Sequence, residues 1–326
     1  HSKLLKIRHE SADMYSLIIK PNKNWKSFKA GQYVELTVVK EGAWISRFFS
    51  ISSSPAYFAN TGLIELSIQK QEKGLITPWL PNTLTEGSMV NLSQAQGEFV
   101  LPNQQQPLLM IAGGSGITPF RSMLQQLALT AKKQDANKRN INLCYYARSH
   151  SHFLFRHELA SFAAELPHLT LHLIDSDAHG FLSEQHLKEF CPDYDSRTIL
   201  LCGPSPMIVH GRTLLKDLNV NKENIMYEFF GPEPVELTSQ TQAANILFKR
   251  SNKQIQVGEN KNDTLLNLAE QANIKAVSGC RIGVCHQCIC QKKSGVVYNS
   301  KTQTYSDTGP QEIQLCVSVP VSDLVL

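Results

Sequence analysis

The sequence has little of what marks several classes of protein. Its longest uninterrupted apolar stretches are short, as at Leu108 to Ala112, and fall far below the length of a membrane-spanning helix. Its 32 Lys and Arg against 28 Asp and Glu leave a formal charge of +4, too small to indicate a nucleic-acid-binding protein. With 42% apolar and 18% charged residues, the composition excludes a disordered chain. It shows no internal repeat and no low-complexity tract.

A signal-peptide pattern is also missing from the first residues, because His1-Ser2-Lys3 leads into mixed polar residues. Eight cysteines are few for a disulfide scaffold, and five of them crowd into the final fifth of the chain. Such clustering indicates a metal centre in a reducing compartment. We therefore expect a cytoplasmic protein without a nucleic-acid partner. Location at the cytoplasmic face of a membrane remains an alternative.

The pattern along the chain separates three segments, and 326 residues suit two to three domains. Residues 1–104 contain short runs with alternate apolar positions, which predict a small antiparallel barrel. Residues 105–231 alternate strands and helices, which predicts an open parallel sheet. Residues 232–244 read as a linker. Residues 245–326 begin with two short strands, and a helix from about Thr264 to Ala272 follows, with Asp263 placed to cap it.

Four cysteines near the carboxyl end have a distinctive spacing. Cys280, Cys285 and Cys288 form C-x4-C-x2-C, and 27 residues separate the last of them from Cys316. This is the plant-type [2Fe–2S] spacing. Two irons bridged by sulfide need four converging thiolates, and a small residue such as Gly283 lets backbone N–H groups reach the sulfurs. We therefore predict that these four cysteines are the metal ligands.

A zinc site is the alternative for this loop, but zinc sites typically use paired C-x2–4-C units, which fit the spacing poorly. Cys290 lies two residues past Cys288. The four predicted ligands are complete without it. We interpret it as a buried apolar thiol. His286 is interpreted as a loop residue with a local hydrogen bond rather than as a catalytic group.

Two stretches of the first segment suit a flavin. Arg47-Phe48-Phe49-Ser50 ends a predicted strand and offers a guanidinium for a pyrophosphate, an aromatic plane for the isoalloxazine ring and a hydroxyl near its N5 atom. Downstream, Gly74 and Thr77 lie in a stretch that can offer backbone N–H groups at a helix start to the same phosphates. Surface packing of the arginine and an ordinary turn at Gly74 are the simpler alternatives.

Two stretches of the second segment directly follow predicted strands. Gly113-Gly114-Ser115-Gly116-Ile117-Thr118-Pro119 opens a helix, where a dinucleotide phosphate is favoured, although G-x-G-x-x-G is absent. Cys202-Gly203-Pro204 ends a later strand, where open α/β sheets place their ligands. A tight strand-to-helix turn and an inert buried Cys202 are the alternatives.

In their order and residues, these motifs resemble the ferredoxin–NADP reductase-like flavoproteins with a C-terminal plant-type ferredoxin domain, over nearly the whole chain. The resemblance implies an antiparallel β-barrel flavin domain, an α/β parallel-sheet nucleotide domain and an α+β, β-grasp-like ferredoxin domain. It implies catalytic roles for Ser50, Cys202 and Glu228, the last in an E-x-F stretch. The cofactor-binding residues that it implies are Arg47, Phe49, Ser50, Gly74, Thr77, Gly113, Gly114, Gly116, Thr118, Pro119, Cys202, Gly203, Pro204 and Phe230.

The implied activity is that of an NAD(P)H-dependent flavin and iron–sulfur oxidoreductase. NAD(P)H reduces FAD, expected here in preference to FMN, and the flavin passes electrons singly to the [2Fe–2S] cluster. The strings from Cys280 to His286 and from Cys316 to Pro320 look most like reductases that serve membrane fatty-acyl desaturases, so a membrane-embedded desaturase is the expected partner. The reductase of a ring-hydroxylating dioxygenase or other monooxygenase, a zinc-stabilised binding module and a simple flavin or ferric reductase remain alternatives.

Local charge adds two predictions. Arg148, after the second strand of the nucleotide segment, suits a 2′-phosphate, whereas Asp175 and Asp177 after the third strand would repel one, so NADH and NADPH both remain open. The ferredoxin segment carries nine Lys and Arg against six acidic residues. We interpret this balance as a solvated basic face, and docking to an acidic partner or peripheral contact with an anionic membrane is the alternative.

Overall fold

The computed structural model of the protein describes residues 1–40, 43–71, 76–103, 106–131, 139–230, 243–258 and 262–326. The chain divides into two compact units. One unit contains His1–Trp44 and Phe48–Phe230, and the other contains Ile45–Arg47 and Gly231–Leu326. The first two predicted segments thus lie almost entirely in one unit and the ferredoxin segment in the other. Most of the predicted linker falls outside the described residues, and its last residue, Ala244, begins a strand.

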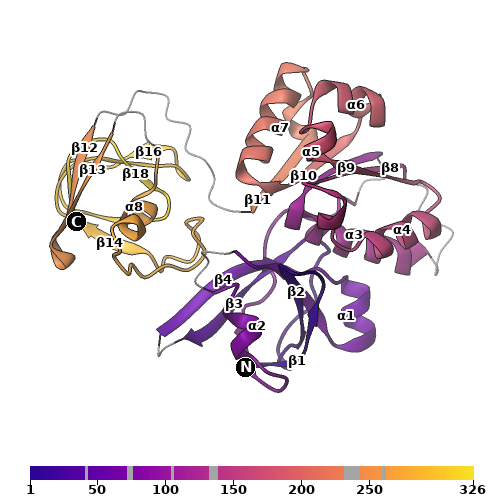
Figure 1. Ribbon diagram of the computed structural model, residues 1–326, viewed down its shortest axis with the longest axis horizontal. Helices are drawn as coiled ribbons and strands as arrows, with labels where there is room; N and C mark the ends of the chain where they lie inside the picture. Colours follow the sequence, from indigo (N-terminus) through magenta and orange to yellow (C-terminus); the bar gives the residue numbers. More distant parts are fainter. Residues whose placement is uncertain (41–42, 72–75, 104–105, 132–138, 231–242, 259–261) are drawn as a thin grey trace. The chain divides into compact units, whose positions relative to one another are not determined.

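Among the described residues, the amino-terminal part of the first unit is a six-stranded antiparallel sheet with the order β4-β3-β6-β1-β2-β5 (Figure 1). A bridge between Ile51, directly after β4, and Leu66 of β5 joins the two edge strands. The sheet therefore closes on itself, as the predicted barrel requires. The elements are β1 Ser2–His9, β2 Met14–Lys20, β3 Tyr33–Lys40, β4 Ala43–Ser50, α1 Pro55–Thr61, β5 Ile64–Gln69, α2 Leu80–Thr83 and β6 Met89–Leu92.

Local sequence explains where α1 begins and ends. The Ser54 hydroxyl accepts a hydrogen bond from the Tyr57 amide, and Pro55 occupies the first helical position, where its missing N–H costs nothing. Gly62 ends the helix at φ 70°, a conformation that glycine adopts without strain. The helix thus begins five residues after Ser50, the end of the predicted flavin motif.

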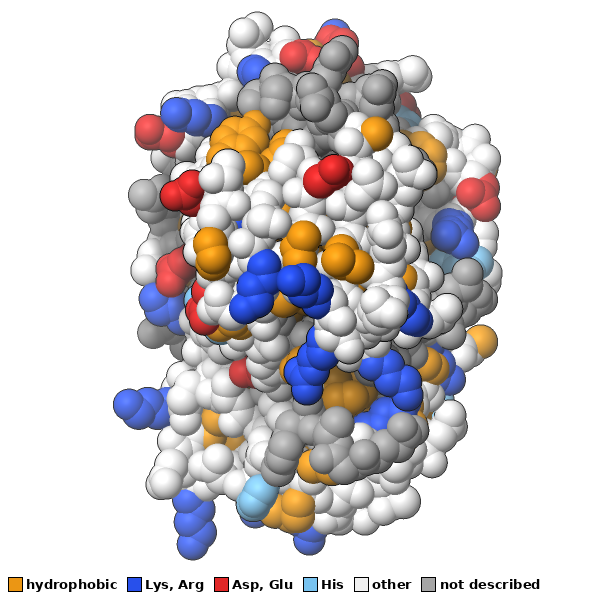
Figure 2. Space-filling view, turned by 90° about the vertical axis from the view of Figure 1, so that its left-hand side faces the viewer, with side chains coloured by type: hydrophobic (Ala, Val, Ile, Leu, Met, Phe, Trp, Pro, Cys, Tyr) orange, Lys and Arg blue, Asp and Glu red, His pale blue; other side chains and the backbone are white. Residues whose placement is uncertain are grey.

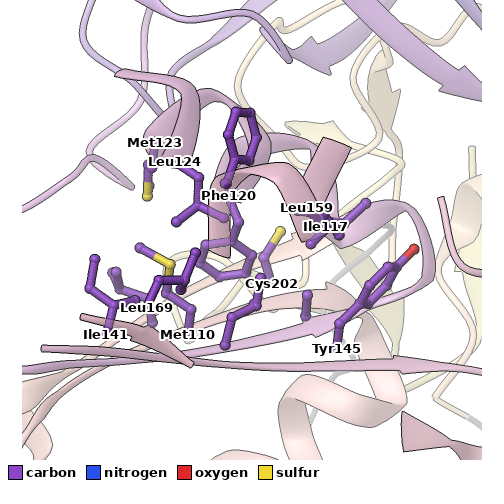
Figure 3. Close-up of a cluster of buried hydrophobic side chains, with 14 of the residues drawn as sticks. Met110, Ile117, Phe120, Met123, Leu124, Ile141, Tyr145, Leu159, Leu169 and Cys202 are labelled. Carbon is purple, nitrogen blue, oxygen red and sulfur yellow. The ribbon is translucent and has the colours of Figure 1, made fainter. Parts of the chain in front are cut away.

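The second part of this unit is a parallel sheet with the order β11-β10-β7-β8-β9. Its strands alternate between two cores, so that Met110 packs under α3 and α4 (Figure 3), whereas Ile111 belongs to the core under α6 and α7. Helices on both faces explain why these strands are apolar throughout. The elements are β7 Leu108–Gly113, α3 Ile117–Ala131, β8 Ile141–Ala147, α4 Arg156–Glu165, β9 Leu169–Asp175, α5 Ser176–His179, α6 Glu184–Phe190, β10 Thr198–Pro204, α7 Ser205–Asp217 and β11 Ile225–Phe230.

The second unit is an α+β fold in which small sheets pack around α8. The sheet orders among the described residues are β13-β12-β19, β14-β17 and β16-β15-β18. Its core joins Leu265 and Leu268 of α8 to Ile246, Val297 and Ile313 of the strands. The elements are β12 Ala244–Phe248, β13 Lys253–Val257, α8 Leu265–Gln271, β14 Ile289–Lys292, β15 Val297–Asn299, β16 Thr304–Tyr305, β17 Gln311–Gln314, β18 Ser318–Pro320 and β19 Leu324–Val325.

Two predicted boundaries are corrected. The cap of α8 is Thr264, whose hydroxyl accepts from the Asn267 amide, and not Asp263, because the helix starts one residue later than that prediction needs. The helix expected near Pro119 begins at Ile117, after a 3-10 turn at Gly114–Gly116. Both helix starts differ little from the predicted ones. They differ because the start of a helix depends on which side chain reaches the first free backbone amides.

The surface of the second unit keeps the predicted excess of basic residues. Lys249, Arg250, Lys275, Lys293 and Lys301 are all exposed. Figure 2 shows one face of the molecule, on which Lys and Arg side chains gather near the centre beside apolar ones. Within the described residues, no helix has both the length and the apolar character that a membrane span needs.

Candidate active site and iron–sulfur loop

The glycine-rich turn after β7 forms an open cradle at the carboxyl edge of the parallel sheet. A Cβ added to Gly116 would lie 2.2 Å from the Cys202 carbonyl oxygen, and one on Gly203 would lie 3.2 Å from three backbone atoms of Gly113. The end of β7 and the turn that follows it therefore approach the backbone at the end of β10 closely. Gly114, at φ 53°, has nothing within 4 Å of its added Cβ, so the turn faces open space at the start of α3. This arrangement fits a dinucleotide phosphate.

Thr118 and Pro119 support this turn from inside. The Thr118 hydroxyl is buried and donates to the Ser115 carbonyl at 3.0 Å. It therefore holds the turn in shape. Pro119 is buried in the first turns of α3, whereas Pro204 is exposed at the end of β10. The structure thus brings the two predicted nucleotide stretches together at one sheet edge.

Ser50, at the end of β4, meets Glu228, in β11. The Ser50 hydroxyl donates to the Glu228 carboxylate at 3.4 Å, and Cys202 pairs with Glu228 across the β10–β11 register. The three residues predicted to be catalytic therefore converge, although they come from distant parts of the sequence. Cys202 itself is fully buried, and its sulfur points into the core among Phe120 and Ile117 (Figure 3).

Burial controls the ionisation of this group of residues. It raises the pKa of Glu228 to about 8, and the hydrogen bond from Ser50 opposes part of that rise. It also raises the pKa of the Cys202 thiol well above its usual range, and the nearby Glu228 carboxylate adds to the effect. A neutral Glu228 can donate a proton or a hydrogen bond at neutral pH, whereas Cys202 stays a protonated thiol.

This shift predicts a pH-dependent stability. Between the ordinary glutamate pKa of 4.5 and about 8, the unfolded chain releases a proton that native Glu228 keeps. The unfolding free energy should therefore fall as pH rises through this window and level off above about 8. We expect Glu228→Gln to show a smaller loss of melting temperature between pH 6 and pH 9 than the parent protein. The exposed Glu223→Gln is the control, and equal losses in parent and Glu228→Gln would contradict the assignment.

The remaining predicted flavin residues of the described chain lie in β4, before α2 and at the end of β11. Phe49 and Phe230 are half-buried, and Phe230 packs against the core beneath α3. Arg47 lies in β4 and donates to the Ser46 carbonyl at 2.8 Å. Thr77 precedes α2 by three residues and accepts from the Gln71 amide, so the predicted helix start lies slightly upstream of the observed one. Gly74 lies outside the described residues.

The strand order indicates where the adenosine half of a nucleotide would lie. Cys202 and Glu228 lie on β10 and β11, to one side of β7, whereas β8 and β9 lie on the other side. Arg148 follows β8 and is exposed, and Asp175 ends β9 and caps α5 by accepting from the Asp177 amide. A dinucleotide bound across β7 would extend toward the strand ends that carry Arg148 and Asp175. The charges predicted to compete for a 2′-phosphate lie on neighbouring strand ends.

A buried ion-pair network, which sequence reasoning missed, joins the barrel to the nucleotide sheet. Arg121 of α3 contacts Glu65 of β5 at 2.8 Å and Glu158 of α4 at 2.6 Å. It also donates to the Ser52 carbonyl at 3.2 Å. Burial alone would lower the pKa of Arg121, but the two carboxylates raise it. The only sequence signal was a charged residue between Phe120 and Met123 on an apolar helix face.

The cysteine loop brings its four predicted ligands together. The Cys280 amide donates to Cys285 Sγ at 3.2 Å and the Cys316 amide donates to Cys288 Sγ at 3.5 Å, while Cys316 also lies near enough to Cys280 to shift its pKa. The four thiols are thus neighbours, as a centre of two bridged irons requires. Among the described residues, no three or more His, Cys, Asp or Glu side chains gather around a single metal position. Cys290 is half-buried on β14 and packs against the core, as the sequence predicted.

Backbone amides point at one of these sulfurs. The N–H groups of Ile282, Val284 and Cys285 donate to Cys280 Sγ at 3.3–3.4 Å. Hydrogen bonding to the thiols of Cys285 and Cys316 lowers the pKa of Cys280, and backbone amides add to the effect. The same interactions raise the pKa of Cys285 and of Cys316. Amides that donate to a cysteine sulfur suit an iron–sulfur centre. His286 contacts Gln314 of β17 through Nδ1 at 3.1 Å, so its partner lies on another element and not within the loop as expected.

Comparison with known domain families agrees with each part of this geometry. Residues 2–101 match the oxidoreductase FAD-binding domain, residues 110–212 the oxidoreductase NAD-binding domain, and residues 248–321 the 2Fe-2S iron-sulfur cluster binding domain. The protein is an NAD(P)H-dependent flavin and iron–sulfur oxidoreductase. The predicted FAD and [2Fe–2S] cofactors of this oxidoreductase, with NAD(P)H as its substrate, are thereby confirmed.

Relatives extend over nearly the full oxidoreductase chain. An NADPH oxidoreductase of Mycobacterium tuberculosis is 28% identical over 99% of this chain and 83% of its own. A glycine betaine monooxygenase reductase subunit of Chromohalobacter salexigens is 26% identical over 92% of this chain and 87% of its own. The solved structure of phthalate dioxygenase reductase is 21% identical, with a TM-score of 0.66 over 100% of this chain and 96% of that one. It shows that the three-part fold is shared.

Proposed function

We propose that this oxidoreductase is the reductase component of an oxygenase system and delivers electrons singly to a terminal oxygenase. The observation that carries the proposal is the presence of flavin, nucleotide and cluster domains in one chain, in the order also matched by the monooxygenase reductase subunit. A cluster that follows a flavin is useful when the acceptor takes one electron at a time. The relatives support this partner better than the membrane desaturase that the sequence strings favoured.

The proposal assigns the domains and the site residues as the sequence predicted them. Residues 1–104 bind the flavin, 105–231 bind the nucleotide, 232–244 link the parts and 245–326 hold the cluster. In the first two domains, the turn from Gly113 to Pro119 binds the nucleotide phosphates, and the Ser50, Cys202 and Glu228 group surrounds the place of hydride transfer. In the third, Cys280, Cys285, Cys288 and Cys316 bind the irons.

Reconstitution with purified partners tests this function. The full-length protein is mixed with NADH or NADPH and, in separate reactions, with the oxygenase component of a glycine betaine monooxygenase and with a fatty-acyl desaturase in lipid vesicles. We expect substrate-dependent NAD(P)H oxidation and hydroxylated product with the oxygenase only. Product formation with the desaturase alone would replace the proposed partner by the desaturase. Rapid NAD(P)H oxidation with ferricyanide is the control for an intact flavin.

A further inference from the structure

One carbonyl of the cysteine loop is held by two side chains from elsewhere in the second unit. Lys301 Nζ donates to the Gly283 carbonyl oxygen at 2.7 Å, and Gln314 Nε2 donates to the same oxygen at 3.4 Å. Lys301 follows β15 and Gln314 ends β17, so the two donors approach from separate elements. We call Lys301 and Gln314 together the Gly283 clamp.

The clamp acts on the peptide that donates to a predicted iron ligand. The Gly283 carbonyl and the Val284 N–H belong to one planar trans peptide, so they point in opposite directions. With the carbonyl held by the clamp, the Val284 N–H points at Cys280 Sγ, 3.3 Å away. A rotation of this peptide would lose both interactions. The clamp therefore fixes the direction of an N–H···S hydrogen bond.

The backbone at Gly283 allows this arrangement and leaves little room for another. Gly283 has φ 72°, and a Cβ there would lie 2.8 Å from Val317 Cγ1 and 3.0 Å from Lys301 Cδ. The stem of Lys301 thus packs directly over the Gly283 Cα while its ammonium binds the carbonyl. Gln314 is itself positioned by His286, whose Nδ1 lies 3.1 Å from the same amide nitrogen.

We propose that Lys301 and Gln314 are positioning residues that raise the reduction potential of the [2Fe–2S] cluster by aiming the Val284 amide at Cys280. Reduction adds one negative charge to the cluster, and hydrogen bonds to its sulfurs and nearby positive charge both stabilise that charge. The inference rests on the proposed role of Cys280 as an iron ligand. It adds a function to two residues that bind neither iron nor nucleotide.

An EPR-monitored potentiometric titration of the holoprotein tests the clamp. For Lys301→Met, we expect the ratio of reduced to oxidised cluster at a fixed potential to fall about tenfold, equivalent to a midpoint about 59 mV lower. Lys301→Arg keeps both charge and donor and should stay within threefold of the parent. Lys249→Met removes the same charge from the turn after β12 and is the matched control. A ratio for Lys301→Met equal to that of Lys249→Met would overturn the proposal.

A second variant separates the effect of the Val284 N–H direction from the effect of the Lys301 charge. It also provides a test if Lys301→Met does not fold. Gln314→Leu leaves the net charge unchanged but removes one donor from the Gly283 carbonyl, so it should lower the ratio in the same direction by a smaller factor. If Lys301→Met fails to retain iron, Gln314→Leu decides the question, and an unchanged ratio there would refute the clamp. The EPR signal of the parent reports the cluster itself, so a failure of the cluster assignment is distinguishable from a failure of the clamp.

Discussion

Replacing Cys285 with serine is expected to abolish electron transfer to one-electron protein acceptors while flavin reduction by NAD(P)H continues. Cys285 lies beside Cys280, whose amide donates to Cys285 Sγ at 3.2 Å. Removing one of four thiolates opens the iron shell, because a serine hydroxyl is a much poorer ligand for these irons than a thiolate. We expect loss of iron, of labile sulfide and of the rhombic EPR signal after dithionite. Cytochrome c reduction should disappear and ferricyanide reduction should persist.

Cys290→Ser provides the matched control for this experiment. Cys290 lies only two residues beyond Cys288 but packs against the core of the second unit, and it is not one of the four predicted ligands. The variant should keep its iron, sulfide and cytochrome c activity. If Cys285→Ser instead retained full cytochrome c reduction, the cluster would be dispensable, and the protein would be the simple flavin reductase that the sequence left open.

Replacing Arg121 with methionine is expected to destabilise the first unit by about 3 kcal/mol, the lower end of the cost of breaking a buried ion pair. The side chain of Arg121 is only 5% exposed and that of Glu65 only 6%. Without the guanidinium, Glu65 retains its contact with Arg8, and Glu158 loses its contact with α3. For a unit of this size we expect a melting temperature roughly 10 °C lower, measured by loss of flavin absorbance or fluorescence change.

Arg8→Met is the control, because Arg8 also contacts Glu65, at 3.0 Å, but is 38% exposed. An exposed pair contributes about 1 kcal/mol or less, so this variant should lose far less stability. Adding Glu65→Gln to Arg121→Met should restore part of the loss, since a neutral amide costs less to bury than an unpaired carboxylate. Equal losses in the Arg8 and Arg121 variants would show that the network does not hold the barrel to α3.

The Arg121 network also connects α3 to the chain segment that follows β4. Arg121 lies one turn beyond Thr118 on α3, and its partner Ser52 lies two residues after Ser50. The helix that carries the nucleotide turn is therefore tied to the strand end that carries the flavin motif. We expect flavin reduction by saturating NAD(P)H to slow in Arg121→Met at temperatures where the variant remains folded.

Much of the fold could be predicted from residue order alone. The alternating apolar positions expected within residues 1–104 recur in β3 and β5, and the apolar run from Leu108 to Ala112 became β7. Such patterns survive in the structure because burial of one or both strand faces dominates local energetics. Helix ends were less certain. Thr264 rather than Asp263 caps α8, since either side chain can compete for the same free amides.

The cysteine spacing by itself determined the type of metal centre, because ligand number and loop length are properties of the chain. Glycines before a helix likewise predicted the tight turn between β7 and α3. Only the tertiary structure decided that Ser50, Cys202 and Glu228 come together. It alone placed Arg121 between Glu65 and Glu158. It also decided that Lys301 and Gln314 both donate to the Gly283 carbonyl. Those contacts join residues distant in sequence, and hydrogen bonds and ion pairs depend on distances of a few ångströms that no local pattern encodes.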